Sequence, residues 1–132
     1  MAPQRAHELI ATELAARPRR HEQAQHLAGC RRLLVVGSGV DEVTAAELAL
    51  KLEEAIHVPT TPLGAEKVLH GHLPAADRDT GLVLLRFDPD HRDVVALQLL
   101  TLELCLAVGT KPDLIRREQP LYRRVADAAG AG

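Results

Sequence analysis

The chain has 132 residues, with 16 Lys and Arg against 18 Asp and Glu, so its formal net charge is −2 at pH 7. This length suits one domain with its own core, and the interspersed charges argue against nucleic acid or an anionic membrane as a partner. No segment reaches the roughly 20 apolar residues that span a bilayer, and no signal-peptide pattern begins the chain. We therefore expect a soluble protein. The two cysteines, Cys30 and Cys105, lie far apart, which favours a reducing, cytoplasmic setting.

The first 28 residues are predicted to be a helical segment that packs on the domain. Leu9, Ile10 and Leu14 recur at helical spacing, and Pro18 is expected to end or kink that helix. A second helical piece is predicted over residues 21–28, and Gly29 follows it.

Two unbroken apolar runs predict buried strands. The first, over residues 33–36, closes in Gly37-Ser38-Gly39, and the second, over residues 82–87, closes in Asp88-Pro89-Asp90. Residues 58–60 could form a third, short strand. Strands that are apolar throughout, and that alternate with helices, predict an α/β fold of three layers, α-β-α, around a small and mostly parallel sheet.

Three helices are expected after the first strand. One covers residues 42–56, with Asp41 as its N-cap and an apolar stripe at the helical period, namely Ala45, Leu48, Ala49, Leu52 and Ile56. A short helix covers residues 65–70. The last, over residues 92–108, is apolar on nearly all sides apart from Gln98 and Glu103, which predicts a helix that is buried or lies at a subunit interface.

The end of the chain contains a helix stop and then a polar tail. Gly109 is expected to cap the last helix, and Pro112 follows it. The remaining residues are charged and then rich in Ala and Gly, which predicts disorder. We therefore expect a helical segment over residues 1–28, an α/β domain over residues 29–113 and a partly disordered tail over residues 114–132.

Glu47, Lys51 and Glu54 follow one another at steps of four and three residues, so they share one face of their helix. They could be functional side chains or a solvated ion-pair row. From periodicity alone the ion-pair row is favoured, because such pairs are common on helix surfaces and add only about 0.2–0.5 kcal/mol each.

Gly37-Ser38-Gly39 resembles the start of a dinucleotide-binding loop, but Glu42 stands where the third glycine belongs, and no Lys-Ser/Thr pair follows. No nicotinamide or ATP cofactor is therefore expected. The segment is either a tight turn between strand and helix, or a turn that also presents backbone N–H groups to an anion.

His70 and His72 flank Gly71, with no Cys or carboxylate at a spacing that suits metal ligands. No metal site is expected there, and either histidine could simply be exposed.

Three stretches carry a family resemblance: VVGSGVDEVTAAELALKLEE, LGAEKVLHGHLPAAD and ALQLLTLELCLAVGTKPD. They resemble the sugar isomerase (SIS) domain family, and specifically the second SIS lobe of the isomerase half of glutamine-fructose-6-phosphate aminotransferase. The match covers most of the chain from Leu33 to Asp113. It implies a SIS-like sheet of flavodoxin-like topology.

The resemblance also implies roles for individual residues. Glu54 matches the carboxylate that moves a proton between the first and second carbons of a hexose 6-phosphate, and Lys51 matches a lysine beside that base. His70 matches a residue that is implicated in ring opening and that reaches the site from a neighbouring subunit. The remaining residues assigned to sugar binding are Gly37, Ser38, Gly39 and Glu47.

The chain departs from the family pattern in ways that limit the implied function. It has no counterpart of the first lobe, whose Ser/Thr-rich loop grips the phosphate, and no glutaminase domain. The sequence RREQP at residues 116–120 lacks the family's C-terminal lysine, Glu53 replaces a motif lysine and His72 replaces a proline. The family places a further helix and strand between the segments that match LVLLRFDPD and the last helix. This chain lacks both, so a truncated sheet is expected.

Two functions remain as hypotheses. In the first, the chain binds a phosphorylated sugar as a homodimer or with a second SIS lobe, and aldose-ketose isomerisation is its catalytic form; full aminotransferase activity is not expected. In the second, a degenerate SIS scaffold serves as a non-catalytic regulatory or interaction module, with the polar row ion-paired, facing solvent and without a pocket.

Overall fold

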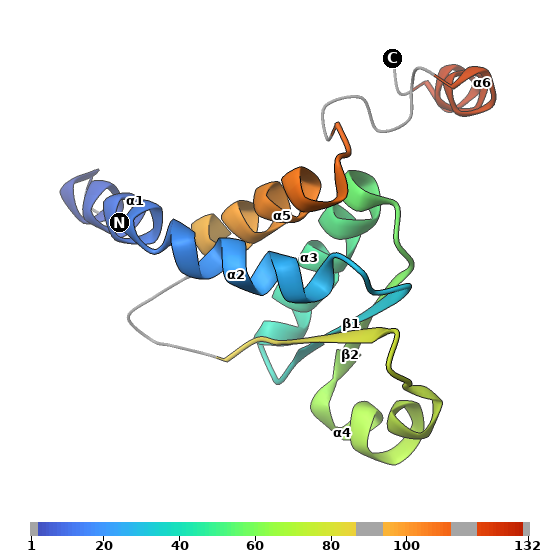
Figure 1. The fold of residues 1–132 in the computed structure, drawn as a ribbon, viewed down its shortest axis with the longest axis horizontal. Coiled ribbons are helices and arrows are strands. Elements are labelled where there is room, and N and C mark those ends of the chain that lie inside the picture. Colours follow the sequence, from blue (N-terminus) through green and yellow to red (C-terminus); the bar gives the residue numbers. More distant parts are fainter. Residues whose placement is uncertain (1–2, 87–93, 112–118, 131–132) are drawn as a thin grey trace.

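A computed structural model describes residues 3–86, 94–111 and 119–130 (Figure 1). The predicted turn Asp88-Pro89-Asp90, the predicted helix start at residues 92–93 and Pro112 lie outside these ranges. The described helices and strands follow in chain order: α1 (Pro3–Ala15), α2 (Arg17–Leu27), β1 (Arg32–Gly37), α3 (Asp41–Ile56), β2 (Thr60–Gly64), α4 (Ala65–Lys67), a π-helical turn (Val68–His72), a 3₁₀ turn (Leu73–Ala75), β3 (Thr80–Leu84), α5 (Val94–Val108) and α6 (Pro120–Ala128). No helix within the described ranges has the length and apolar character that crossing a membrane requires.

A small parallel sheet forms the centre of the fold, and the predicted α/β class is confirmed. β1 lies in the middle of the order β2-β1-β3, and both neighbours run parallel to it. Leu33 pairs with Thr60 on one side, and Leu34 pairs with Leu82 on the other. Because both edges of β1 are paired and both of its faces are covered, residues 33–37 are all buried. This explains why the strand is apolar without alternation.

The two outer strands differ from their predicted positions. β2 covers residues 60–64 rather than 58–60 and contains Pro62, which an edge strand tolerates because only one of its sides is paired. β3 covers residues 80–84 rather than 82–87. Its predicted burial is wrong for Leu82 and Leu84, whose side chains are 48% and 62% exposed.

The core is divided unequally between the two faces of the sheet. α2, α3 and α5 cover one face, where Leu33 and Val35 join the larger hydrophobic cluster (Figure 1). On the other face, Leu34 and Val36 join a smaller cluster with Val68, which follows α4. Leu82 and Leu84 share this second face through their pairing with Leu34 and Val36. They stay exposed because the short helical turns after β2 cover only part of it.

α3 buries the apolar stripe that the sequence predicted, and Ala55 extends it. The predicted N-cap is wrong. Asp41 is the first helical residue, and Val40 precedes it without a capping side-chain bond. The turn is closed by the backbone instead, because the Asp41 N–H donates to the Ser38 carbonyl at 3.1 Å and the Glu42 N–H donates to the Gly39 carbonyl at 3.2 Å.

Both ends of the chain add helices to the domain. The break between α1 and α2 falls at Ala16, and Pro18 lies in the first turn of α2, which begins at Arg17 rather than at the predicted residue 21. Ile10 and Leu14, predicted at helical spacing on α1, remain 45% and 53% exposed. α5 forms where predicted and is buried on one side. Gly109 ends it with φ of 79°, and the Gly109 N–H donates to the Cys105 carbonyl at 2.8 Å. Within the predicted tail, residues 120–128 form α6.

We predict that Gly37→Ala destabilises the fold by roughly 1–3 kcal/mol. A methyl group at this position would lie 2.2 Å from the Asp41 carbonyl oxygen, so the turn into α3 would have to shift. Gly29→Ala is the matched control, because nothing lies within 4 Å of a methyl group there. Urea unfolding of both variants measures the difference, and equal midpoints would contradict the prediction.

Candidate functional site

The polar row of α3 consists of Glu47, Lys51 and Glu54. The Lys51 ammonium donates to Glu54 Oε2 at 3.3 Å and lies 4.0 Å from Glu47 Oε1. Glu54 is 35% exposed, whereas Lys51 and Glu47 are 53% and 66% exposed. The structure thus brings the three together as an ion-paired row on the outer face of α3. Glu54 is the most enclosed member of this row.

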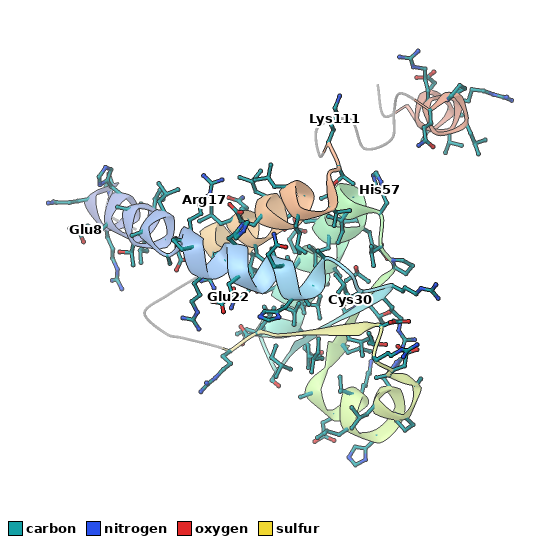
Figure 2. All side chains as sticks on the ribbon, viewed as in Figure 1. Glu8, Arg17, Glu22, Cys30, His57 and Lys111 are labelled. Atoms are coloured by element: carbon teal, nitrogen blue, oxygen red, sulfur yellow. The ribbon has the colours of Figure 1, made fainter. Side chains whose placement is uncertain are left out.

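Glu53, beside the row, has a structural role that the sequence did not reveal. Its carboxylate accepts a hydrogen bond from the backbone N–H of Thr60 at 2.9 Å, and this bond ties the end of α3 to the start of β2. Between them, His57 adopts a left-handed conformation with φ of 60° and lies beyond the end of α3 (Figure 2). Glu54 therefore lies at the end of the sheet where the parallel strands begin.

His70 lies at the opposite end of the sheet, where the parallel strands finish. It is in the π-helical turn that follows β2 and α4, and His70 and Glu66 are 80% and 94% exposed, with 3.8 Å between His70 Nε2 and Glu66 Oε2. His72 is also exposed. Among the described residues, no group of three His, Cys, Asp or Glu side chains is arranged to hold a metal ion.

The length of β2 separates Glu54 from His70 within one chain. Glu53 is bonded to the first residue of β2, and His70 comes six residues after its last, Gly64. Five residues of parallel strand span roughly 13–17 Å, and Figure 1 shows the end of α3 and α4 at opposite ends of the sheet. Within one chain, Glu54 and His70 therefore lie near opposite ends of the sheet.

Gly37, Ser38 and Gly39 lie at the same end of the sheet as His70, where β1 finishes. β1 is flanked by β2 on one side and β3 on the other, so this turn is at a switch point of the sheet, a common place for ligands in α/β folds. Gly37 is buried, Ser38 is exposed and Gly39 has φ of 60°. Asp41 and Glu42 lie in the first turn of α3. Their negative charges weaken the attraction of this helix start for an anion.

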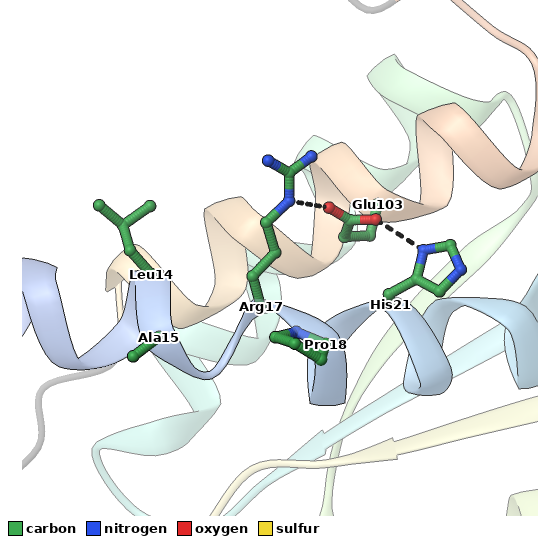
Figure 3. A pocket seen from close by; sticks show the side chains of 6 residues that line it. All are labelled: Leu14, Ala15, Arg17, Pro18, His21 and Glu103. Carbon is green, nitrogen blue, oxygen red and sulfur yellow. Dashed lines mark hydrogen bonds and ion pairs between the residues drawn. The ribbon is translucent and has the colours of Figure 1, made fainter.

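A second cluster, which the sequence did not predict, joins α2 to α5. Glu103 is 3% exposed, and its two carboxylate oxygens accept hydrogen bonds from Arg17 Nε at 2.5 Å and from His21 Nδ1 at 2.9 Å (Figure 3). These bonds hold the pKa of the Glu103 carboxyl below its ordinary value, with His21 and then Arg17 as the largest causes, against the opposing effect of burial. The sequence signal was a lone carboxylate in an otherwise apolar helix.

An open hollow of about 510 Å³ lies over this cluster. Its lining comes from the junction of α1 with α2 and from α5 (Figure 3), namely Leu14, Ala15, Arg17, Pro18, His21 and Glu103. Because Glu103 bonds both Arg17 and His21, its first effect is to attach α2 to α5. None of the residues predicted for sugar binding lines this hollow.

Comparisons with known proteins show the family of this sequence. A family model for the SIS domain matches residues 26–111, more than half of the chain. The chain belongs to the SIS domain family. The matched range includes β1, α3, β2, β3 and α5, and with them the whole polar row and His70.

Two similar proteins extend this result. The SIS chain is 31% identical over 77 residues to a glutamine-fructose-6-phosphate aminotransferase (isomerizing) from Bradyrhizobium diazoefficiens; the match covers 58% of this chain and 13% of that protein. Its fold is similar to the C-terminal domain of glucosamine-fructose-6-phosphate aminotransferase from Francisella tularensis, with a TM-score of 0.68 and 16% identity over 79% of this chain and 43% of that one. The SIS chain thus spans a small part of the curated relative, and the structural likeness concerns the fold.

We predict that Glu103→Gln lowers the free energy of unfolding by about 1–3 kcal/mol at pH 7, because two charge-assisted hydrogen bonds are weakened. The effect depends on pH. A carboxyl whose pKa is lowered by folding contributes stability above its ordinary pKa of about 4.3 and loses it as the pH falls through the lowered value. Wild type should therefore lose stability faster than Glu103→Gln on acidification below about pH 5.

Thermal unfolding from pH 7 to pH 3 measures this difference. Glu22→Gln, which alters an exposed carboxylate on α2 (Figure 2), is the control and should follow wild type. Parallel curves for wild type and Glu103→Gln would contradict the assignment of Glu103 as a stabilising buried anion.

Proposed function

We propose that this SIS domain binds a phosphorylated sugar of the hexose 6-phosphate class, in a site that two chains share. The observation that carries the proposal is the Lys51–Glu54 pair, 3.3 Å apart on the face of α3, within the range that matches the family. The separation of Glu54 from His70 supports a site with one residue from each chain. A homodimer supplies the second chain in the simplest way.

The chemistry proposed for this site is aldose-ketose isomerisation. The Glu54 carboxylate would take the proton from the carbon beside the sugar carbonyl and return it to the neighbouring carbon, while a hydroxyl proton moves to the carbonyl oxygen. The Lys51 ammonium would stabilise the negative charge that develops on that oxygen. His70 of the second copy would assist ring opening. The name of the curated relative includes an isomerising activity, and this supports the choice of reaction.

A second candidate function is a non-catalytic regulatory or interaction module. Its support is the exposure of the row, since Glu47 and Lys51 are 66% and 53% exposed, and the position of the hollow, which lies over α1, α2 and α5 instead. A titration with sugar phosphates separates the two functions, because an interaction module has no reason to bind them.

We predict that fructose 6-phosphate and glucose 6-phosphate raise the melting temperature. At ten times the dissociation constant, binding to the folded state adds about 1.4 kcal/mol, which corresponds to roughly 3–8 °C for a domain of this size. Inorganic phosphate and unphosphorylated glucose are the control ligands. A melting temperature that stays constant at millimolar sugar phosphate would rule out the proposed ligand class.

We predict further that Glu54→Gln and His70→Ala are each inactive as isomerases while keeping the wild-type circular dichroism spectrum. When the two variants are mixed, unfolded and refolded together, half of the dimers are mixed, and each has one site with Glu54 and His70 both intact. About a quarter of wild-type activity should return. Glu22→Gln, an exposed carboxylate on α2, should retain full activity. Two inactive variants whose mixture stays inactive would exclude a shared site.

A further inference from the structure

The two outer strands of the sheet differ in how their outward-facing main-chain groups are bonded. β1 lies between β2 and β3, so each outer strand has one side that no other described strand pairs with. In an extended strand, the N–H and C=O groups of one residue point to one side, and those of the next residue point to the other. Every second residue of β2 and of β3 therefore faces away from β1.

The outer edge of β2 is closed to a further strand. The Leu33 N–H donates to the Pro59 carbonyl at 3.0 Å, so Pro59 and every second residue after it face β1, whereas Thr60 and Pro62 face outward. The Thr60 N–H is already bonded to the Glu53 carboxylate at 2.9 Å, and Pro62 has no N–H to donate. Proline on an edge strand is one of the features that prevent unwanted strand pairing.

The outer edge of β3 is open at two residues. The Leu85 N–H donates to the Val36 carbonyl at 2.8 Å, so Leu85 faces β1, and Leu82 and Leu84 face outward. Within the described part of the chain, the outward N–H and C=O groups of Leu82 and Leu84 have no hydrogen-bond partner. We call these two residues the open edge.

The residues of the open edge also expose their side chains. Leu82 and Leu84 are 48% and 62% exposed. They lie on the face of the sheet that carries α4, whereas α2, α3 and α5 cover the other face (Figure 1). β3 contains no proline and no charged residue, and its register with β1 is unbroken. The open edge thus lacks the proline, the charge and the bulge that keep other edge strands unpaired.

We propose that the open edge of β3 binds an extended segment of another protein, which adds a fourth strand to the described sheet. An extended backbone offers N–H and C=O groups at the two-residue spacing that Leu82 and Leu84 present. A helix bonds its own main-chain groups internally, so it would cover the leucine side chains and leave these groups unpaired. A strand satisfies the backbone and buries the side chains at the same two residues.

The surroundings of the open edge define the chemistry of the partner. An antiparallel segment is the favoured arrangement, because antiparallel pairing is slightly more stable per residue. Its residues opposite Leu82 and Leu84 lie on the same face as these leucines, so apolar side chains are expected there. Arg86 follows at the next alternate position, is exposed and has no ion-pair partner within the described residues. The partner segment should therefore have the order acidic, any, apolar, any, apolar.

This interaction goes beyond the proposed sugar binding and does not depend on it. Lys51 and Glu54 lie on α3, which covers the opposite face of the sheet. A protein that binds no sugar phosphate could still add a strand at the open edge. The failure of one proposal is therefore distinguishable from the failure of the other.

The test is amide hydrogen exchange measured by NMR, which suits a chain of 14.3 kDa. The probe is the blocked hexapeptide Asp-Thr-Val-Thr-Val-Thr. In the free protein, we expect the amides of Leu82 and Leu84 to exchange faster than that of Val83, which faces β1. Saturating peptide should slow exchange at Leu82 and Leu84 by about tenfold and leave Val83 unchanged. The same peptide with both valines N-methylated should have no effect, because it cannot donate to the open edge.

Variants of the open edge separate strand addition from general apolar binding. Leu84→Pro removes an outward N–H but no bond to β1, so it should keep the wild-type circular dichroism spectrum and bind the peptide at least about tenfold more weakly. Leu84→Lys keeps the backbone intact and should also weaken binding, which covers the case in which the proline variant does not fold. Leu106→Lys is the matched control. Leu106 is 59% exposed on α5, and this variant should bind the peptide as wild type does.

Four results would overturn the proposal. The first is slow exchange at Leu82 and Leu84 in the free dilute protein, since another part of the chain would then occupy the edge. The second is protection of these amides that appears without peptide as the protein concentration rises, since a second copy would then be the occupant. The third is peptide binding that leaves both amides unchanged, and the fourth is equal binding of the N-methylated peptide.

Discussion

Burial of β1 on both faces is the constraint on which the rest of this SIS domain depends. A strand with paired edges and two covered faces has no place for a polar side chain, and residues 33–36 contain none. Covering the first face requires helices that pack apolar side chains against it, and α2, α3 and α5 provide them. The strand also has to leave the sheet abruptly, and Gly37 allows this because the Asp41 carbonyl occupies the space of a side chain. One strand thus fixes both the layer of helices and the start of α3.

The same topology separates the two ends of α3. A parallel sheet requires α3 to return from the end of β1 to the start of β2, so residues at the two ends of α3 lie at opposite ends of the strands. Glu54 is at the end where the strands begin. Gly37, Ser38, Gly39 and His70 are at the end where the strands finish. The motif that looks continuous in the sequence is therefore divided in space. The site proposed to be shared by two chains rests on this division.

The described part of the protein contains two kinds of charged cluster, one buried and one exposed. The buried carboxylate of Glu103 has both oxygens hydrogen-bonded, one to Arg17 and one to His21, which offsets the cost of removing an anion from water. Because Arg17 and His21 belong to α2 and Glu103 belongs to α5, these bonds add to the apolar packing of Ala24 in attaching α2 to the SIS domain. The row on α3 differs from this cluster, since its members face solvent, where ion pairs contribute little to stability. Such side chains remain available for binding.

The sequence by itself determined the fold class, β1, the buried stripe of α3, the position of α5 and the cap at Gly109, because each depends on local periodicity or on a single backbone conformation. It also identified Glu47, Lys51 and Glu54 as neighbours, since helical spacing alone brings them together. Only the tertiary structure decided that Leu82 and Leu84 are exposed and that Glu103 is buried and bonded to Arg17 and His21. It also decided that Glu54 and His70 lie at opposite ends of the strands of the sheet. These facts depend on which elements pack against each other across the chain, and no local pattern contains that information.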